Sequence, residues 1–200
     1  MTLSRSTPRI RFTKAIYLAV IVLVAVSHGR MLTGLAGTLA QLAGLVLVSL
    51  AVLGRLWTSL FIAGRKDREL VTDGPYSVCR NPLYGLSLVG AAGIGLASRS
   101  VTLTLALPAL LAVIFARVIR QEESHLASVH AGDYAAYQAA VPRYWPDPAR
   151  YRPRLEARVP TRIYHKAFLD AASFLLLYVL TVAADVLARE HLLPAPLLLP

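Results

Sequence analysis

Two short polar segments contain the residues best suited to chemistry. The first covers residues 73–85 and the second covers residues 117–126. They combine guanidinium, carboxamide, carboxylate and phenol groups, which bind ions and exchange protons. A reaction site in this chain is therefore expected to draw on these two segments.

Local signals predict how these side chains are presented. Gly74-Pro75 is typical of a turn, and Pro82 is typical of the first turn of a helix, where its missing N–H costs nothing. In the second segment, residues three or four apart would be neighbours on one helical face, as Arg120 is to Glu123. Around the predicted helix start lie Arg80, Asn81 and Tyr84.

The composition predicts that these segments border a membrane. The 200 residues are 56% hydrophobic and only 16% charged, with a mean hydropathy of +0.55. An ordinary soluble domain carries roughly a quarter charged residues. We therefore expect an all-α fold, a polytopic helical membrane protein with about five transmembrane helices and a cytoplasmic helical segment between the last two. The predicted runs are residues 12–28, 32–53, 83–97, 101–118 and 167–187.

Small residues within these runs predict close helix packing. Ala36, Ala40 and Gly44 recur every four positions and should form one packed face. Gly90-x-x-Gly93-x-Gly95 lacks the preceding strand of a dinucleotide-binding loop, so helix packing is favoured for it as well. The third and fourth runs should form a hairpin through Ser98-Arg99-Ser100, so that the two polar segments emerge side by side.

The basic residues predict an orientation. With five spans and a cytoplasmic N-terminus, only Arg30, Arg99 and Arg189 lie outside, and the other 18 of 21 Lys and Arg residues are cytoplasmic. Four spans would return the C-terminus inside. We expect an uncleaved first helix and a multi-pass protein of a bacterial inner membrane. We treat 1–200 as one membrane domain, with an N-terminal part (1–70), a core (71–146), and a basic linker with the last helix (147–200).

Several other function classes are disfavoured. The net charge of +10 lies between apolar runs and not on one soluble face, so anionic lipid headgroups are expected as partners and nucleic acid is not. A single cysteine, Cys79, and five histidines without ligand spacing predict no metal site. Cys79 is more plausible as an inert residue than as a nucleophile. Tyr144 and Trp145 fit an aromatic belt at the membrane interface.

Five elements follow one another between residues 71 and 146. They are Gly74-Pro75-Tyr76, Arg80-Asn81-Pro82-x-Tyr84, Glu122-Glu123-x-x-Leu126, Gly132-x-Tyr134-x-x-Tyr137 and Val141-Pro142-Arg143. In this order, flanked by apolar runs, they resemble the isoprenylcysteine carboxyl methyltransferases and their relatives among bacterial phospholipid N-methyltransferases. That family usually has histidine where this chain has Asn81, whose amide still donates and accepts hydrogen bonds.

The resemblance implies a methyltransferase that uses S-adenosylmethionine at the cytoplasmic membrane face. Its acceptor would be lipophilic, an isoprenylcysteine-like carboxylate or a phospholipid amine, and would enter from the bilayer. An amine acceptor must be neutral, and Glu123 or a nearby tyrosine could take its proton. The implied catalytic residues are Glu123, Arg143 and Tyr137. The implied cofactor-binding residues are Tyr76, Arg80, Asn81, Tyr84, Glu122, Glu123 and Leu126.

Two other functions remain open. Some NADPH-dependent sterol reductases are similar in the stretch from the Gly-Pro-Tyr turn to the Tyr-x-x-Tyr segment. A non-catalytic membrane subunit would use Arg80 and the glutamates only as solvated interfacial ion pairs.

Overall fold

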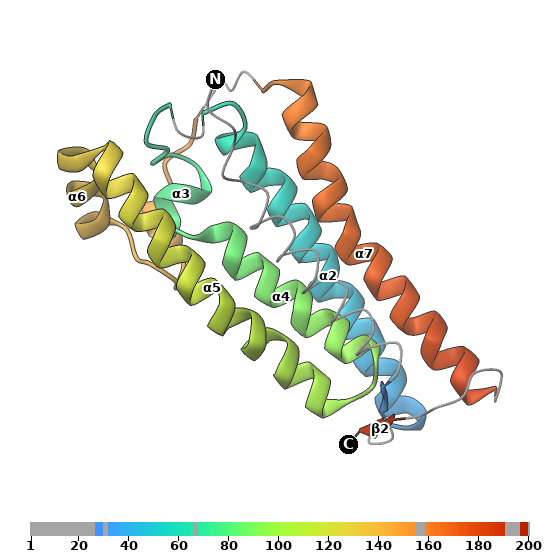
Figure 1. Ribbon diagram of the computed structural model, residues 1–200. Helices are drawn as coiled ribbons and strands as arrows, with labels where there is room; N and C mark the ends of the chain where they lie inside the picture. Colours follow the sequence, from blue (N-terminus) through green and yellow to red (C-terminus); the bar gives the residue numbers. More distant parts are fainter. Residues whose placement is uncertain (1–26, 30–31, 66–67, 155–158, 191–196, 200) are drawn as a thin grey trace, which may run out of the picture.

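The computed structural model describes residues 27–29, 32–65, 68–154, 159–190 and 197–199, and its secondary structure is almost entirely helical (Figure 1). Two three-residue strands, β1 (Ser27–Gly29) and β2 (Leu197–Leu199), pair in parallel. The helices are α2 (Gly34–Ile62), α3 (Pro75–Val78), α4 (Pro82–Ala97), α5 (Val101–Val129), α6 (Ala131–Ala140), the 3-10 turn η1 (Pro148–Arg150) and α7 (Thr161–Arg189).

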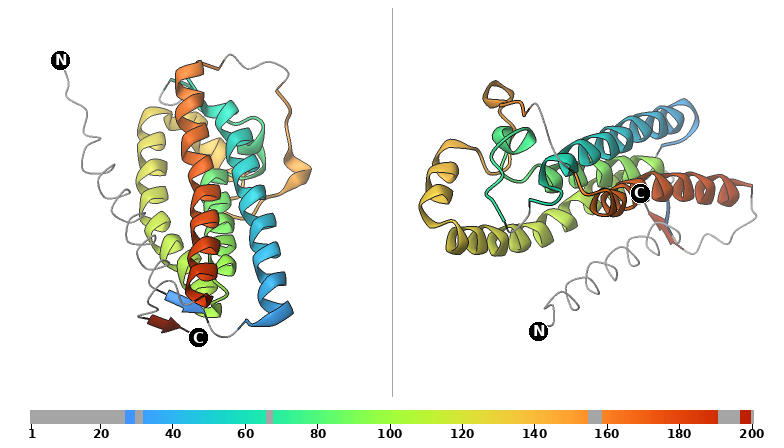
Figure 2. Two further views of the ribbon diagram at one scale, coloured as in Figure 1. Left: turned by 90° about the vertical axis from the view of Figure 1, so that its right-hand side faces the viewer. Right: turned by 90° about the horizontal axis from the view of Figure 1, so that it is seen from above.

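Three described helices are long and apolar enough to cross a membrane: α2, α5 and α7. The fourth apolar helix, α4, has 16 residues and is about 24 Å long, which is shorter than the roughly 30 Å of bilayer hydrocarbon. The short length is tolerated because α4 packs against α2, α5 and α7 (Figures 1 and 2). Among the described residues, three long helices and the short α4 thus correspond to four of the five predicted spans, and most of the fifth, the run 12–28, lies outside the described residues.

The structure describes only the end of the predicted first membrane span. Most of the predicted first run, 12–28, lies outside the described residues. Its last two residues, Ser27 and His28, belong to strand β1, so the prediction of a helix reaching His28 is wrong. The strand pairs with Leu197–Leu199 near the opposite end of the chain, a partner that local hydropathy does not reveal.

The crossing of α2 and α4 depends on glycine. A Cβ on Gly44 would lie 2.6 Å from the carbonyl oxygen of Gly93, and a Cβ on Gly93 would lie 2.7 Å from that of Gly44. The predicted packing role of the Gly90–Gly95 run is confirmed, since Gly90 also faces Phe174 of α7. The predicted Ala36-Ala40-Gly44 face is wrong in part because Ala36 is exposed and Ala40 is half-buried. The buried face of α2 instead contains Gly37, Gly44, Val48 and Ala51.

The hairpin between α4 and α5 forms at the predicted residues. Arg99 adopts a positive φ of 58° in the turn, and Ser100 accepts a hydrogen bond from the Leu103 N–H to begin α5. The core beneath the hairpin combines α2, α4, α5 and α7. Its buried side chains are Val48, Ala91, Ile94, Ala97, Leu103, Leu107, Phe174, Leu177 and Tyr178.

A buried polar cluster closes the hairpin end of the bundle. Arg99 Nε lies 3.2 Å from Asp185 Oδ2, and Arg189 reaches the same oxygen at 2.9 Å. Gln41 of α2 donates to Asp185 at 2.9 Å and accepts from Arg99 at 3.0 Å. Two of the three basic residues predicted to lie outside therefore share one end of the molecule. The two polar segments lie at the other end.

Candidate active site

The site is built on the turn that leads into α4. Gly74 has φ +57°, and a side chain there would collide with the ring of Phe61, so glycine is required. The one-turn helix α3 follows from Pro75, and Pro82 begins α4 as the sequence predicts. Gly74 also forms an antiparallel bridge with Arg152, its N–H donating to the Arg152 carbonyl at 2.8 Å. This turn holds Arg80 and Asn81 at the start of α4.

Glu123 of α5 is the centre of the cluster. One carboxylate oxygen lies 3.3 Å from Arg80 Nε and accepts a hydrogen bond from the Asn81 amide at 3.2 Å. The other oxygen accepts from Arg143 Nη2. The side chains of Glu123 and Arg80 are each 9% exposed, whereas that of Arg143 is 35% exposed. The prediction that the two polar segments emerge side by side is confirmed by these contacts.

Arg80 also connects the cluster to the segment after α6. Its Nη1 donates to the carbonyl of Gln138 at 2.6 Å and to that of Val141 at 3.3 Å. Its backbone N–H donates to the Pro142 carbonyl at 2.9 Å. Within the described residues the guanidinium makes its contacts through Nε and Nη1, which leaves Nη2 able to donate to a further partner. Because the chain turns back over Arg80, residues 138–143 are fixed against α4.

Arg143 lies at the water-facing side of the cluster. Its carbonyl accepts from the Asn81 amide at 3.2 Å, and its guanidinium lies 5.5 Å from the centre of the Tyr144 ring. The hydrogen bond to Glu123 raises the pKa of Arg143, so the group stays cationic. The structure therefore unites four of the predicted site residues, Arg80, Asn81, Glu123 and Arg143.

A second pair lies beside this cluster. The Tyr84 hydroxyl donates to Glu122 at 2.8 Å, and its ring centre lies 4.9 Å from that of Phe115 on α5. Tyr84 and Glu122 therefore bring α4 and α5 together on the face next to Glu123. Leu126 is half-buried one turn further along α5.

The remaining predicted tyrosines are buried in the support of the site. The Tyr137 hydroxyl donates to the Tyr76 carbonyl at 2.8 Å, and the Tyr76 ring packs with Phe61 and Val71. Burial raises the pKa of Tyr76, Tyr134 and Tyr137, so these phenols stay protonated at neutral pH. Tyr76 does not line the pocket described next, and Tyr137 lines a different cavity.

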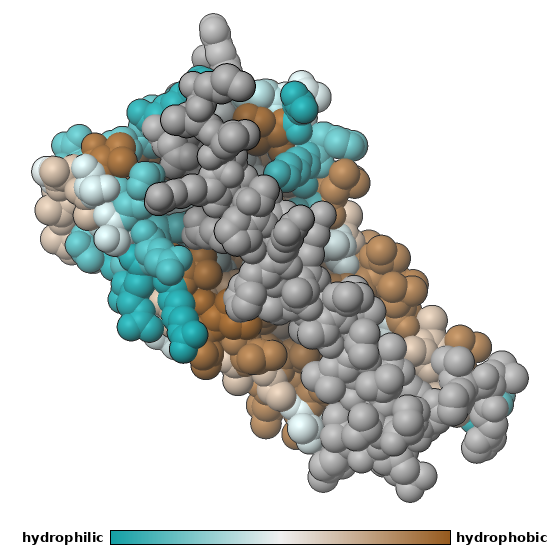
Figure 3. Space-filling view, viewed as in Figure 1, coloured by the Kyte–Doolittle hydropathy of each residue, from teal (hydrophilic) through white to brown (hydrophobic). Residues whose placement is uncertain are grey.

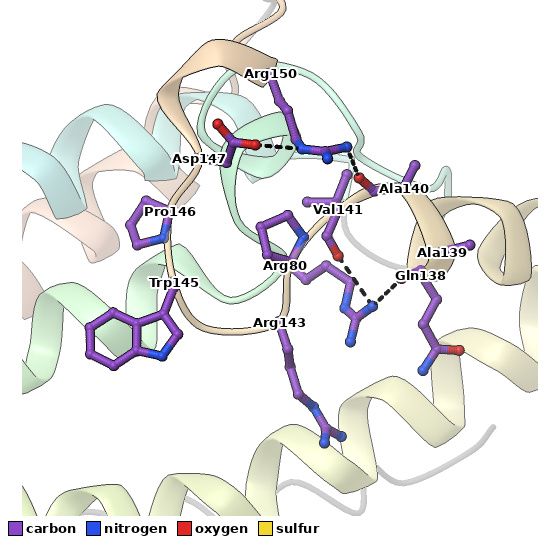
Figure 4. A pocket seen from close by; sticks show the side chains of 11 residues that line it. Arg80, Gln138, Ala139, Ala140, Val141, Arg143, Trp145, Pro146, Asp147 and Arg150 are labelled. Atoms are coloured by element: carbon purple, nitrogen blue, oxygen red, sulfur yellow. Dashed lines mark hydrogen bonds and ion pairs between the residues drawn. The ribbon is translucent and has the colours of Figure 1, made fainter.

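An open pocket of about 530 Å³ adjoins Arg80 and Arg143 (Figure 4). Trp145 and Pro146 lie on one side of it and Gln138 on the other, and Arg143 points toward α5. Asp147 and Arg150 form an ion pair of 2.7 Å at its rim. The sequence analysis did not select Gln138 or Asp147, since nothing in their local sequence distinguishes them from surface residues.

Hydrophilic side chains gather at the end of the molecule that carries α3 and α6, and hydrophobic ones cover much of the visible surface of the long helices (Figure 3). Trp145 is 85% exposed and Tyr144 is also exposed. Such amphipathic rings are typical of the boundary between lipid and water. The candidate site therefore lies at the polar end of an apolar bundle.

The buried Cys79 adjoins the same loop. Its Sγ approaches the carbonyl of Tyr144 at 3.4 Å and that of Arg143 at 3.5 Å. Burial raises the pKa of the Cys79 thiol, which keeps it from acting as a thiolate. Within the described residues no group of three or more His, Cys, Asp or Glu side chains could hold a metal ion.

Comparisons with known proteins show the family of the chain. The family model described as phospholipid methyltransferase matches residues 30–132, just over half of the chain. The chain belongs to the phospholipid methyltransferase family. The match covers Arg80, Asn81 and Glu123 but ends before Arg143. It also begins in front of α2, well before the region 71–146 that the motifs had indicated.

Two curated relatives carry names of another kind. The chain is 35% identical over 157 residues to the nickel-cobalt-cadmium resistance protein NccN of Alcaligenes xylosoxydans xylosoxydans, covering 78% of this chain and 73% of that protein. It is 38% identical over 142 residues to the cobalt-zinc-cadmium resistance protein CzcN of Cupriavidus metallidurans, covering 71% of this chain and 65% of that protein. No solved structure matches the chain.

Proposed function

We propose that this protein transfers a methyl group from S-adenosylmethionine to a lipophilic acceptor at the cytoplasmic face of the membrane. The observation that carries the proposal is the cluster of Arg80, Asn81, Glu123 and Arg143, assembled from three separate segments beside an open pocket. Buried charges at a membrane boundary are expensive, which favours a functional role for such a cluster.

The donor set fits the proposed cofactor. Nε of Arg143 is buried and has no hydrogen-bond partner among the described residues, and the hydrogen bonds of the Arg80 guanidinium within those residues use Nη1 and not Nη2. Both guanidinium groups would hold the carboxylate of S-adenosylmethionine, and Asp147 at the rim would accept from its amine. The exposed indole of Trp145 offers a flat apolar wall for a ring or a sulfonium cation. When bound, the cofactor supplies an electrophilic methyl group.

The protein's own residues would orient the acceptor and manage its proton. Loss of the sulfonium charge favours a water-poor site, so rate would come mainly from alignment. A carboxylate acceptor needs no base. For an amine acceptor, the Glu123 carboxylate is a better proton acceptor than Tyr137, because burial holds that phenol protonated. Tyr137 and Tyr76 are proposed to position the loop, while Tyr84, Glu122 and Leu126 would complete the wall between α4 and α5.

The five-span topology with a cytoplasmic N-terminus belongs to the same proposal. It puts the candidate site inside and the cluster of Arg99, Asp185 and Arg189 outside. Alkaline phosphatase fused after Arg99 should then be active, and green fluorescent protein fused after Val129 should fluoresce. The reverse pattern would refute this orientation.

Ligand-dependent thermal unfolding of the detergent-purified protein tests the cofactor assignment. S-adenosylmethionine and its demethylated product should raise the midpoint by mass action, and the shift should be lost in Arg80→Ala and Glu123→Ala. A shift with NADPH alone would instead favour a membrane reductase. No shift with any of these ligands would favour a non-catalytic subunit.

The names of the two relatives favour one further role. Both are called resistance proteins for divalent transition-metal cations. We propose that methylation by this protein takes place in the cell's response to such cations, and not that the described helices carry them. A deletion strain should then be more sensitive to cobalt or cadmium, and Glu123→Gln should fail to restore growth.

A further inference from the structure

A second cavity, of about 870 Å³, lies next to the candidate active site. The two cavities share Ala140, Val141 and Arg150 in their walls. The hydrogen bond from Arg150 to the Ala140 carbonyl lies in this shared wall. The second cavity is otherwise lined by the segment after α2, by one face of α6 and by the chain after η1. The methyl-transfer proposal leaves it unassigned.

Two arginines in its wall are free to bind an anion. The backbone of Arg152 is fixed, since its N–H donates to Ser77 Oγ at 2.9 Å and its carbonyl accepts from the Gly74 N–H at 2.8 Å. Arg68 is held by its N–H, which donates to the Arg65 carbonyl at 3.0 Å. Neither guanidinium makes a hydrogen bond or ion pair within the described part of the chain. Both line the cavity.

The acidic groups that line the same cavity do not neutralise the charge of Arg68 and Arg152. Glu69 is paired with Arg65, and the third arginine, Arg150, is paired with Asp147. Asp133 remains, and it stands in the first turn of α6, where the helix dipole favours a negative charge. His130 adds a buried Nε2 that has no hydrogen-bond partner among the described residues. Arg68 and Arg152 thus offer cationic donors to the cavity, and His130 adds a ring nitrogen without a partner among the described residues.

The cavity also reaches the boundary of the bilayer. Tyr151 lines it, and the Tyr151 ring centre lies 5.9 Å from that of Trp57, an exposed residue near the end of α2. Because α2 is long and apolar enough to span, its exposed terminal tryptophan marks the level of the headgroups. We propose that the second cavity binds a phosphate group, through Arg68 and Arg152, of a ligand other than the methyl donor. A cavity this large has room for further atoms, as in a lipid headgroup.

Binding to the full-length protein in neutral detergent tests this site. The probes are dioctanoyl phosphatidic acid, dioctanoylglycerol, which has the same tails without phosphate, and inorganic phosphate at constant ionic strength. Titration calorimetry should show binding of the phosphate-bearing probes and not of dioctanoylglycerol. The double variant R68Q/R152Q should weaken phosphate binding by about tenfold or more, since two charge-assisted hydrogen bonds are lost.

The matched control is R117Q/R162Q, which removes the same charge from two exposed arginines that line neither cavity. It should change affinity by less than about threefold, because screened surface charge contributes little. Ala136→Trp, which fills the cavity without changing charge, should also abolish binding, and it serves if R68Q/R152Q fails to fold.

The outcomes separate the alternatives. Binding of phosphatidic acid that far exceeds binding of inorganic phosphate assigns a lipid headgroup, and equal binding assigns a free phosphate compound. Equal losses in both double variants, or no binding of either phosphate probe, would overturn the proposal. Competition between phosphate and S-adenosylmethionine would overturn it too, because the cavity would then belong to the cofactor. Failure of the methyl-transfer proposal leaves these measurements unaffected.

Discussion

Replacing Glu123 by glutamine should destabilise the protein strongly, because it leaves two guanidinium groups without their counter-ion. Breaking a buried ion pair from one side costs about 3–5 kcal/mol. The amide oxygen of glutamine keeps part of the hydrogen bonding, and Arg143, whose side chain is 35% exposed, can be hydrated. We therefore expect a loss of about 2–3 kcal/mol, which lowers the unfolding midpoint by roughly 4–12 °C for a chain of this size.

Glu122→Gln is the matched control, since it removes the same charge one residue away. Within the described residues Glu122 accepts from Tyr84, whereas the ion pairs with Arg80 and Arg143 belong to Glu123; because Glu122 is also only half-buried, the midpoint of E122Q should fall less. Thermal unfolding in detergent, followed by near-ultraviolet circular dichroism, measures both variants. The double variant E123Q/R143Q should be less destabilised than the sum of its two single variants. Additive losses, or equal midpoints for E122Q and E123Q, would refute the assignment of Glu123 as the centre of the cluster.

Three further predictions follow from local geometry. Gly44→Ala should cost about 1–3 kcal/mol of unfolding free energy by overpacking the α2–α4 crossing, whereas Gly85→Ala, with nothing within 4 Å of the added Cβ, should be neutral or stabilising, as denaturant titration of both will show. Burial would raise the pKa of Asp73, but hydrogen bonds from Arg65 and Arg154 outweigh it and hold the pKa below its usual value. The unfolding free energy of wild type should thus exceed that of Asp73→Asn by a constant amount above about pH 5, and the difference should shrink as the pH falls below about 4. A difference that stays constant down to low pH would contradict this. N-ethylmaleimide should label Cys79 slowly in the native protein and fast after denaturation, because the thiol is buried and its pKa is raised; rapid native labelling would show otherwise.

The sequence predicted the elements wherever apolar residues run without interruption. The runs 83–97 and 101–118 became α4 and the membrane part of α5, and Pro82 begins α4 as expected. The predicted run 32–53 lies in α2, which continues to Ile62 because Arg55 does not end the helix. Arg55 pairs with Asp170 of α7 and donates to Ser87 of α4. No local signal reveals a partner that is 115 residues away.

The candidate site was predictable to a similar degree. The hairpin argument correctly brought Arg80 and Asn81 next to Glu123, since two helices joined by a short turn must end together. The role of the loop carbonyls that hold Arg80 could not be predicted, because they belong to irregular chain whose path depends on tertiary contacts. Tyr137 was selected for its motif, but its hydroxyl is used within the support of the site.

Methyl transfer in membranes tests the central claim most directly. Membranes containing the wild-type protein would be incubated with S-adenosylmethionine labelled in its methyl group, next to membranes with E123Q and membranes without the protein, and the lipid extract would be counted. The account predicts a labelled, lipid-extractable product with wild type and a loss of about a hundredfold or more with E123Q. Label that is equal in wild-type and protein-free membranes, although the purified protein binds S-adenosylmethionine, would contradict it.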